Sequence, residues 1–313
     1  NNGVDYLAVA YPDEGVELRK AGIRLPIMVM NTERAGFYNI VHYELEPELY
    51  SFNLAHDFIS YLQRLGITGY PVHIKLDTGM HRLGFDPADV GNLAALLRDT
   101  PELKVASVFS HLAGSGDKQL DYFTTKQAAT FEEMVIEISK EIDYPFIKHL
   151  VNSAGIIRHP AFHYDMVRLG IGLYGVDDNE SVLASLQTVA TLRTTISQIR
   201  LVKSGDCVGY NRAGKVERDT LVATVGIGYA DGYPRVLGNG VGAMYIGGKM
   251  APVIGNICMD MTMLDITGID AREGDDVIVF GAFPTVSSLA AKAGTIGYEI
   301  LTGISQRVKR VYF

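Results

Sequence analysis

Short β-rich runs alternate with helical patterns through the first half of the chain, and this alternation restricts the fold more than any other feature. Seven runs have strand character, namely YLAVA, PIMVM, IVHYEL, PVHIKLD, LKVASVFSH, FIKHLVNS and YDMVRLG. Such alternation is typical of βαβ units in a parallel sheet. A closed (β/α)8 barrel needs eight strands. We therefore expect an α/β barrel that lacks its first strand–helix unit, with an open seven-stranded sheet as the alternative.

The second half of the chain has a different texture. Runs such as TLVATVGIGYA, MTMLDIT and DDVIVFG are β-rich and separated by turn residues, and a single helix is expected over SSLAAKAGTIGYEILTGI. This pattern predicts a mostly antiparallel β domain. We expect a partial barrel over residues 1–184 and the β domain over residues 185–313.

Composition restricts the possible partners. The formal net charge of −8 argues against nucleic acid, because phosphates attract basic surfaces. No apolar run approaches the roughly 20 residues that span a bilayer. The two cysteines, Cys207 and Cys258, have neither metal-site nor disulfide spacing. These features predict a cytoplasmic protein with no metal and no membrane partner.

Polar residues gather where the predicted strands end, which is where barrels of this kind carry their sites. They are Lys75, Asp77, His111, Asn152, Ser153 and Arg168. Each one alone has a structural explanation as well. His111 is explained by a satisfied core histidine, Asn152 and Ser153 by a helix cap, and Arg168 by an ion pair.

Together these residues suit a small, planar, phosphorylated cofactor. Ser153 precedes a short helical pattern, and free backbone N–H groups at a helix start attract anions. Gly170 and Gly172 allow the backbone to approach a ligand closely. Arg168, beside them, is suited to donate to a ring nitrogen, which is one way that proteins tune pyridoxal phosphate.

The motifs KLDTGMHRLG, VRLGIGLYG, GYADGYPR, ICMDMTMLD and GYEILTGISQRVKRVY, taken together, resemble those of the alanine racemase family. The resemblance runs from DYLAVA to RVKRVYF and so covers nearly the whole chain. It implies a pyridoxal phosphate barrel followed by a β domain, in a head-to-tail homodimer. It also implies interconversion of L-alanine and D-alanine, which supplies bacterial peptidoglycan synthesis.

The same resemblance implies a role for each site residue. Tyr229 resembles the catalytic tyrosine that the partner subunit contributes, and His111 the histidine that tunes it. Arg168 resembles the arginine at the pyridine nitrogen. The phosphate contacts are implied to be Ser153, Gly170, Ile171 and Tyr298, with Asn152 beside them.

Two further residues are implied to act at the substrate, and a third to position one of them. Arg82 resembles the arginine near the phenolic oxygen and the substrate, and Met259 the residue whose backbone holds the substrate carboxylate. Lys75 resembles a lysine that carbon dioxide carbamylates in many members, so that it orients Arg82.

One departure from the family is plain. The Schiff-base lysine lies in a motif resembling VKADAYGHG at the first barrel strand, and this sequence contains no such motif. We therefore expect a fragment, from a free racemase or from a fusion to a cell-wall ligase, that is inactive on its own. A pyridoxal phosphate decarboxylase of the same fold and a non-catalytic cofactor-binding protein stay open as alternatives. The choice between alanine and serine also stays open.

Overall fold

The computed structural model describes residues 3–177 and 186–312. The chain divides into two units, Asn1–Leu169 and Gly170–Phe313, each with its own hydrophobic core. The predicted boundary between residues 184 and 185 lies outside the described residues.

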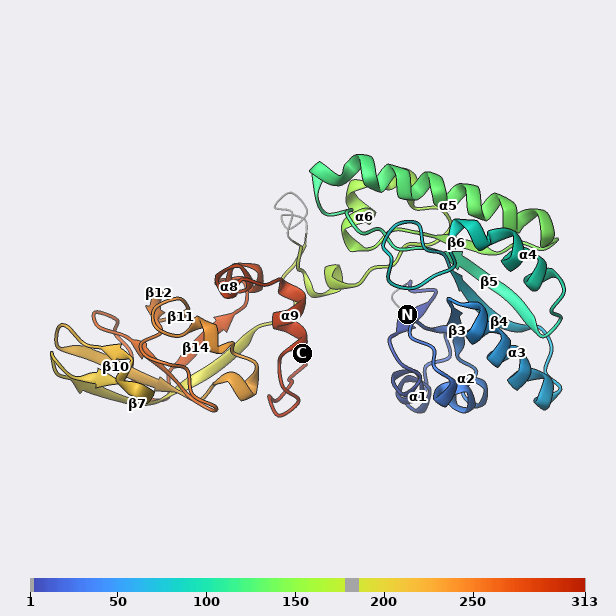
Figure 1. The fold of residues 1–313 in the computed structure, drawn as a ribbon. Helices are drawn as coiled ribbons and strands as arrows, with labels where there is room; N and C mark the ends of the chain where they lie inside the picture. The colour runs from blue at the N-terminus through green and yellow to red at the C-terminus, as the bar shows by residue number, and fades with distance from the viewer. Residues whose placement is uncertain (1–2, 178–185, 313) are drawn as a thin grey trace. The chain divides into compact units, whose positions relative to one another are not determined.

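The N-terminal unit is built on a parallel sheet whose strand order follows the chain order, β1-β2-β3-β4-β5-β6. The strands are β1 (Leu7–Val9), β2 (Ile27–Val29), β3 (Glu46–Leu49), β4 (Tyr70–Lys75), β5 (Leu103–Phe109) and β6 (Ile147–His149). Figure 1 shows that the sheet curves and that its helices lie along the outer side. This half-barrel of parallel strands confirms the predicted α/β barrel class, with six strands in the sheet where seven were expected.

Six helices accompany these strands. They are α1 (Pro12–Lys20), α2 (Phe37–His42), α3 (Phe52–Leu65), α4 (Val90–Arg98), α5 (Asp121–Glu141) and α6 (Ser153–Arg158). Helix α3 shows how the sequence specifies its ends. The Ser51 hydroxyl accepts from the Leu54 N–H at 3.3 Å, and Gly66 ends the helix at φ 66°. Its face of Leu54, Phe58 and Leu62 is buried in the core.

One predicted strand is wrong. IVHYEL was expected to be a strand, but its first residues end α2, and β3 begins afterwards at Glu46. The strand that forms has the sequence EPEL. Glutamate is uncommon in strands and proline cannot donate to the sheet, so this sequence does not predict a strand. Pro47, Glu48 and Leu49 are nevertheless buried, so the sheet around them decides their conformation.

The predicted seventh strand, YDMVRLG, forms only an isolated bridge and a few backbone hydrogen bonds beside β6. The Asp165 N–H donates to the Lys148 carbonyl at 3.0 Å, and the Arg168 N–H donates to the Val151 carbonyl at 3.1 Å. Between them, Met166 forms an isolated parallel bridge with His149. The segment therefore follows the parallel direction and carries Arg168 to the carboxyl end of β6.

The C-terminal unit is an antiparallel sheet of order β12-β11-β14-β7-β10-β13. Its strands are β7 (Leu192–Val202), β10 (Thr220–Val225), β11 (Ala243–Ile246), β12 (Lys249–Pro252), β13 (Thr262–Asp265) and β14 (Asp276–Phe280). A small hairpin, β8 (Cys207–Val208) and β9 (Gly214–Lys215), lies apart from this sheet. An antiparallel bridge between Val253 and Leu264 joins the two ends of the sheet, so the unit is barrel-like.

The single helix expected near the C-terminus is two helices, α8 (Val286–Ala293) and α9 (Gly297–Thr302). Gly294 separates them in a left-handed conformation, with φ 73°, which caps α8. Glycine adopts this conformation at little cost, so it ends a helix that the apolar pattern alone would continue.

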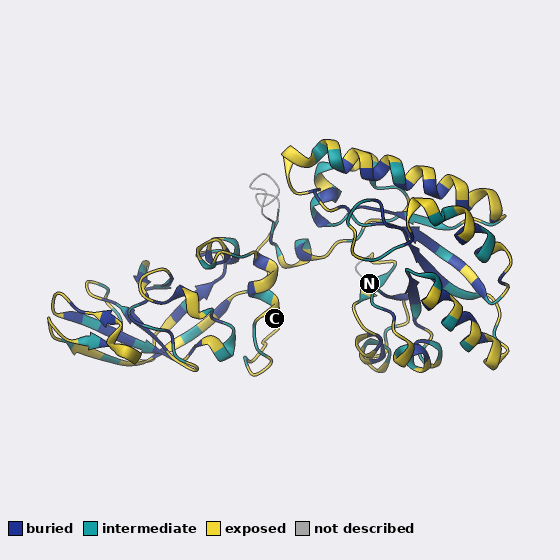
Figure 2. Ribbon diagram, in the orientation of Figure 1, coloured by how far each residue is buried: buried dark blue, intermediate teal, exposed yellow. Residues whose placement is uncertain are grey.

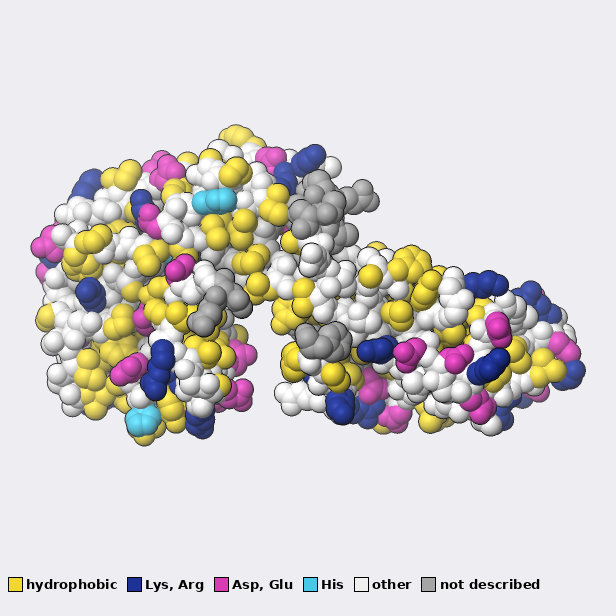
Figure 3. All heavy atoms as spheres, turned by 180° about the vertical axis from the view of Figure 1, so that it is seen from behind, with side chains coloured by type: hydrophobic (Ala, Val, Ile, Leu, Met, Phe, Trp, Pro, Cys, Tyr) yellow, Lys and Arg dark blue, Asp and Glu magenta, His cyan; other side chains and the backbone are white. Residues whose placement is uncertain are grey.

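Buried residues gather in the cores of the two units. Figure 2 shows buried residues along the strands and exposed residues on the outer faces of the helices. On the face of the C-terminal unit that Figure 3 shows, basic and acidic side chains are interspersed. None of the helices within residues 3–177 and 186–312 combines the length and apolar character needed to cross a bilayer.

Candidate active site

Arg168 is the centre of a polar cluster at the carboxyl ends of β5 and β6. Its Nη1 donates to His149 Nδ1 at 2.7 Å. Its Nη2 donates to the carbonyls of Ser110 at 2.7 Å and Leu150 at 2.9 Å, and reaches His111 Nδ1 at 3.3 Å. Burial lowers the pKa of Arg168 to about 10, so the guanidinium stays cationic near neutrality. The ion-pair explanation considered for Arg168 gives way to a cation held by neutral acceptors.

Arg168 also determines which nitrogen of His111 carries the proton. Burial, assisted by the charges of Arg168, Lys75 and Arg82, lowers the pKa of His111 to about 3. The ring is therefore neutral at pH 7. Because a guanidinium only donates, His111 Nδ1 must accept, and the proton must lie on Nε2. His111 is thus a neutral donor directed by its neighbour.

A chain of hydrogen bonds runs from Arg168 across the sheet. Burial and the charge of Arg168 lower the pKa of His149 well below its usual value, so His149 is neutral and donates from Nε2 to Ser107 Oγ at 2.8 Å. Ser107 Oγ lies 2.6 Å from His73 Nδ1, and His73 Nε2 lies 2.9 Å from Glu46 Oε2. Every donor meets an acceptor, and the chain ends on a carboxylate.

Lys75 lies at the end of β4, and its partner is a residue that sequence reasoning missed. Its Nζ is 3.7 Å from Glu48 Oε2, and both side chains are buried. Burial raises the pKa of Glu48 to about 7, although the charges of Lys75, Arg168 and Arg82 act to lower it. Burial also lowers the pKa of Lys75. The signal for Glu48 was weak, because EPEL does not look like a buried strand.

Asp77, which follows Lys75 by two residues, serves the following loop. Its Oδ1 accepts from the backbone N–H groups of Gly79, Met80 and His81 at 2.9 to 3.0 Å. Its Oδ2 lies 3.1 Å from His81 Nδ1. Arg82, the next residue, is exposed. Asp77 therefore shapes the loop that carries Arg82.

Asn152 and Ser153 lie at the start of α6. The Asn152 Oδ1 accepts from the Gly155 N–H at 3.1 Å and from Ser115 Oγ at 2.7 Å. Asn152 therefore caps α6, which is the structural role that the sequence had left open for it. Ser153 is the first residue of the helix and is buried.

The remaining predicted residues belong to the C-terminal unit. Ile171 is buried in the core of that unit, and Tyr298 is 47% exposed on α9. Gly170 precedes the short helical turn Ile171–Tyr174. The predicted phosphate contacts are thus divided between the two units.

Tyr229 and Met259 are held side by side in the C-terminal unit. The Tyr229 N–H donates to the Cys258 carbonyl at 3.1 Å, and the Ala230 N–H donates to the Met259 carbonyl at 3.0 Å. The side chains of Tyr229 and Met259 are 43% and 53% exposed. The unit therefore presents both side chains to its surroundings.

Arg307 supports this pair of turns from one side. It reaches Asp231 at 2.8 Å and Asp260 at 2.6 Å. These two aspartates follow Tyr229 and Met259 closely in the sequence, so one arginine ties both turns together.

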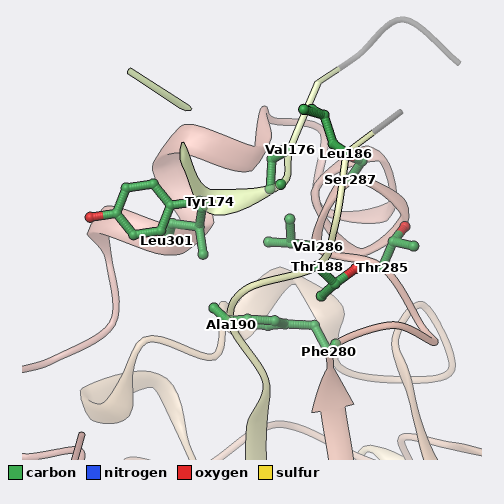
Figure 4. A pocket seen from close by; sticks show the side chains of 12 residues that line it. Tyr174, Val176, Leu186, Thr188, Ala190, Phe280, Thr285, Val286, Ser287 and Leu301 are labelled. Carbon is green, nitrogen blue, oxygen red and sulfur yellow. The ribbon is translucent and has the colours of Figure 1, made fainter. Parts of the chain in front are cut away.

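A separate cavity of about 200 Å³ lies in the C-terminal unit (Figure 4). Tyr174, Val176, Phe280, Val286 and Leu301 line it. None of the predicted site residues is among its lining, which contains no carboxylate, imidazole, amine or guanidinium group.

The donor set of the N-terminal unit fits pyridoxal phosphate, which carries a phosphate and a phenolic oxygen around a pyridine ring. The charges of Lys75, Arg168 and Arg82 all act to lower the pKa of Glu48, so three cations lie near this one acid. Asp77, the acid nearest to Lys75 along the chain, is hydrogen-bonded within its own loop. This excess of positive charge suits an anionic ligand.

The comparisons with known proteins agree along both units. Residues 1–178 match the family model "Alanine racemase, N-terminal domain", and residues 189–312 match "Alanine racemase, C-terminal domain". The chain is 37% identical to alanine racemase 1 of Clostridium acetobutylicum, over 99% of this chain and 82% of that protein. It is also 37% identical to the alanine racemase of Halothermothrix orenii, over 99% of this chain and 83% of that protein.

Solved structures give the same result. The alanine racemase of Clostridium difficile 630 superposes with a TM-score of 0.91 at 36% identity, covering 99% of this chain and 82% of that one. The alanine racemase of Bartonella henselae with covalently bound pyridoxal phosphate superposes with a TM-score of 0.89 at 30% identity, covering 99% and 86%.

Proposed function

Because the chain belongs to the alanine racemase family, and so is a pyridoxal phosphate-dependent isomerase that interconverts L-alanine and D-alanine, we propose how its residues divide that reaction. The 37% identity to alanine racemases over nearly the whole chain favours racemisation over decarboxylation or a non-catalytic role. When bound, the cofactor draws electrons from the α-carbon and so acidifies the α-proton. The roles below belong to the protein's own side chains.

Arg168 donates to the pyridine nitrogen and keeps that nitrogen unprotonated. The observation that carries this proposal is the guanidinium held by His149, His111 and two carbonyls, with no carboxylate bonded to it among the described residues. An acid at this position would protonate the ring, whereas a cationic donor opposes protonation. The hydrogen-bond chain through Ser107 keeps Arg168 in one orientation.

Tyr229 is the base on one face of the substrate and acts in the partner's site. Racemisation needs a base on each side of a planar carbon. A tyrosine has a reference pKa of about 10, so it needs a neighbour that stabilises its phenolate. His111 serves this purpose, because its Nε2 proton is directed away from Arg168 and is available to donate to the phenolate. No residue of this sequence is assigned as the opposite base.

The remaining roles complete the site. Arg82 and the Met259 backbone hold the substrate, and Ser153, Gly170, Ile171 and Tyr298 hold the phosphate, with Asn152 shaping the helix start beside them. The exposure of Tyr229 and Met259 supports a head-to-tail homodimer. The enzyme acts in the cytoplasm, where D-alanine enters peptidoglycan synthesis.

A tyrosine substitution tests the base. This test and the activity tests below use a form of the enzyme that carries the family's Schiff-base lysine. In that form, Tyr229→Phe should lower the racemisation rate by about 10²- to 10⁴-fold, because it removes only the hydroxyl that moves the proton. Tyr210→Phe is the matched control, since Tyr210 is an exposed tyrosine of the same unit and is 69% exposed. Unchanged racemisation by folded Tyr229→Phe would remove Tyr229 from the reaction.

Subunit mixing tests whether Tyr229 acts in the partner's site. Tyr229→Phe and Arg168→Ala should each be nearly inactive, but mixing them with subunit exchange creates heterodimers with one intact site. An equal mixture should recover about a quarter of the parent activity if the dimer is two-fold symmetric. No recovery, with exchange verified by mass, would assign Tyr229 to its own subunit's site.

A further inference from the structure

Glu48 is a buried acid that the proposed reaction does not use. It lies on β3 with 0% exposure, and neither carboxylate oxygen has a hydrogen-bond partner among the described residues. The nearest charge is Lys75 Nζ at 3.7 Å. A buried carboxylate without hydrogen bonds is costly, so it needs a role or a counter-charge.

The surroundings of Lys75 Nζ favour a cation on two sides. Glu48 lies on one side, and the ring centroid of Phe109 lies 4.6 Å away on another. The face of an aromatic ring attracts a cation and repels an anion. A carbamate at this nitrogen would therefore place a second negative charge against both a buried carboxylate and an aromatic face.

We propose that Glu48 supplies the buried anion of this site, so that Lys75 stays an unmodified ammonium paired with it. This proposal rests on the proposed function, because it assigns a positioning role within the racemase site. It also replaces the carbamate that the sequence predicts for Lys75. Glu48 is then a positioning residue: its negative charge pairs with the positive charge of Lys75, near Arg168 and Arg82.

The chemistry explains why the pair excludes carbamylation. Carbamylation begins when the neutral amine attacks the carbon of carbon dioxide and an N–C bond forms. The electrons of one C–O π bond move to oxygen, and the nitrogen then loses a proton to water. Burial and the charges of Arg168 and Arg82 lower the pKa of Lys75, whereas Glu48 acts in the opposite direction and so favours the protonated amine, which has no lone pair to attack. Removing the charge of Glu48 while keeping its shape should release the amine for this reaction.

Carbon-13 NMR of protein equilibrated with ¹³C-bicarbonate tests the proposal without measuring activity. The parent enzyme should show no carbamate resonance. Glu48→Gln should show one, and the signal should vanish in Glu48→Gln combined with Lys75→Arg. Glu48→Asp is the matched control: it keeps the carboxylate and should stay free of carbamate.

Two outcomes would overturn the proposal. One is a carbamate resonance in the parent enzyme that Lys75→Arg removes; this measurement needs no Glu48 variant and so does not depend on how Glu48→Gln folds. The other is folded Glu48→Gln that stays free of carbamate. Racemisation by the parent is measured separately, so a failed role for Glu48 is distinguishable from a failed assignment of the reaction.

Discussion

A single arginine decides the protonation of several side chains. Arg168 can only donate, so His149 and His111 must each accept at Nδ1 and carry their proton at Nε2. The effect passes through Ser107 to His73 and ends on Glu46. A set of residues that could titrate in many ways is thereby held in one arrangement.

Ser107 is the residue on which this arrangement depends. Ser107→Ala leaves the Nε2 proton of His149 and the Nδ1 of His73 buried without partners. We expect a loss of about 2–6 kcal/mol in the free energy of unfolding, since each of the two unsatisfied buried groups costs roughly 1–3 kcal/mol. Chemical denaturation followed by circular dichroism measures it.

Ser139→Ala provides the comparison for Ser107→Ala. Ser139 lies on α5, and its hydroxyl donates to the Val135 carbonyl at 2.8 Å, which already belongs to the helix. Its loss should change stability by about 0.5 kcal/mol or less. Equal effects of the two substitutions would show that the chain through Ser107 is not a special source of stability.

At the scale of elements, the turn that carries Tyr229 is defined by close packing against the Met259 segment. A Cβ on Gly228 would lie 2.3 Å from the carbonyl oxygens of both Cys258 and Met259. These oxygens accept the hydrogen bonds from Tyr229 and Ala230 that hold the two segments together. Glycine is needed here for space, because its backbone is extended, with φ −147°.

Gly228→Ala should therefore separate the two segments. We expect a destabilisation of about 1–3 kcal/mol from overpacking, together with a fall in kcat/KM for alanine, because Tyr229 and Met259 both move. Thermal unfolding and steady-state racemisation in both directions measure the two effects.

The control lies two residues earlier in the same turn. A Cβ on Gly226 would meet only the hydroxyls of Ser197 and Thr194, at 3.8 Å, which is ordinary contact. Gly226→Ala should change stability by about 0.5 kcal/mol or less. If Gly228→Ala behaved like Gly226→Ala, the close approach would not control the turn.

The whole molecule consists of two units with separate cores. Phe58 and Leu264 are each 0% exposed, Phe58 in the core of the N-terminal unit and Leu264 in that of the C-terminal unit. A folded unit with its own core is expected to open on its own.

Core truncations should therefore act locally. Phe58→Ala should cost about 3–5 kcal/mol and Leu264→Ala about 2–5 kcal/mol. Hydrogen exchange read by peptide should accelerate within the truncated unit and stay near the parent rate in the other. Matching acceleration across residues 3–169 and 186–312 in both variants would show that the two cores unfold together.

The sequence by itself determined the class of each half and the family, and the family resemblance supplied the predicted site residues. The strand and helix patterns predict the parallel α/β unit and the β domain, because hydrophobic periodicity reflects which face of an element is buried. The motifs around Lys75, Arg168, Tyr229 and Met259 led to the family, because each packs several chemical groups into a short stretch.

Only the tertiary structure decided which side chains meet. Glu48 lies in a stretch that has no strand signal, and its contact with Lys75 exists because β3 and β4 are neighbours in the sheet. The chain from Arg168 to Glu46 joins residues up to 122 positions apart through hydrogen bonds whose direction no local pattern encodes. Local propensity sets the elements, whereas buried polar groups must find partners, and those partners are known only once the strands lie side by side.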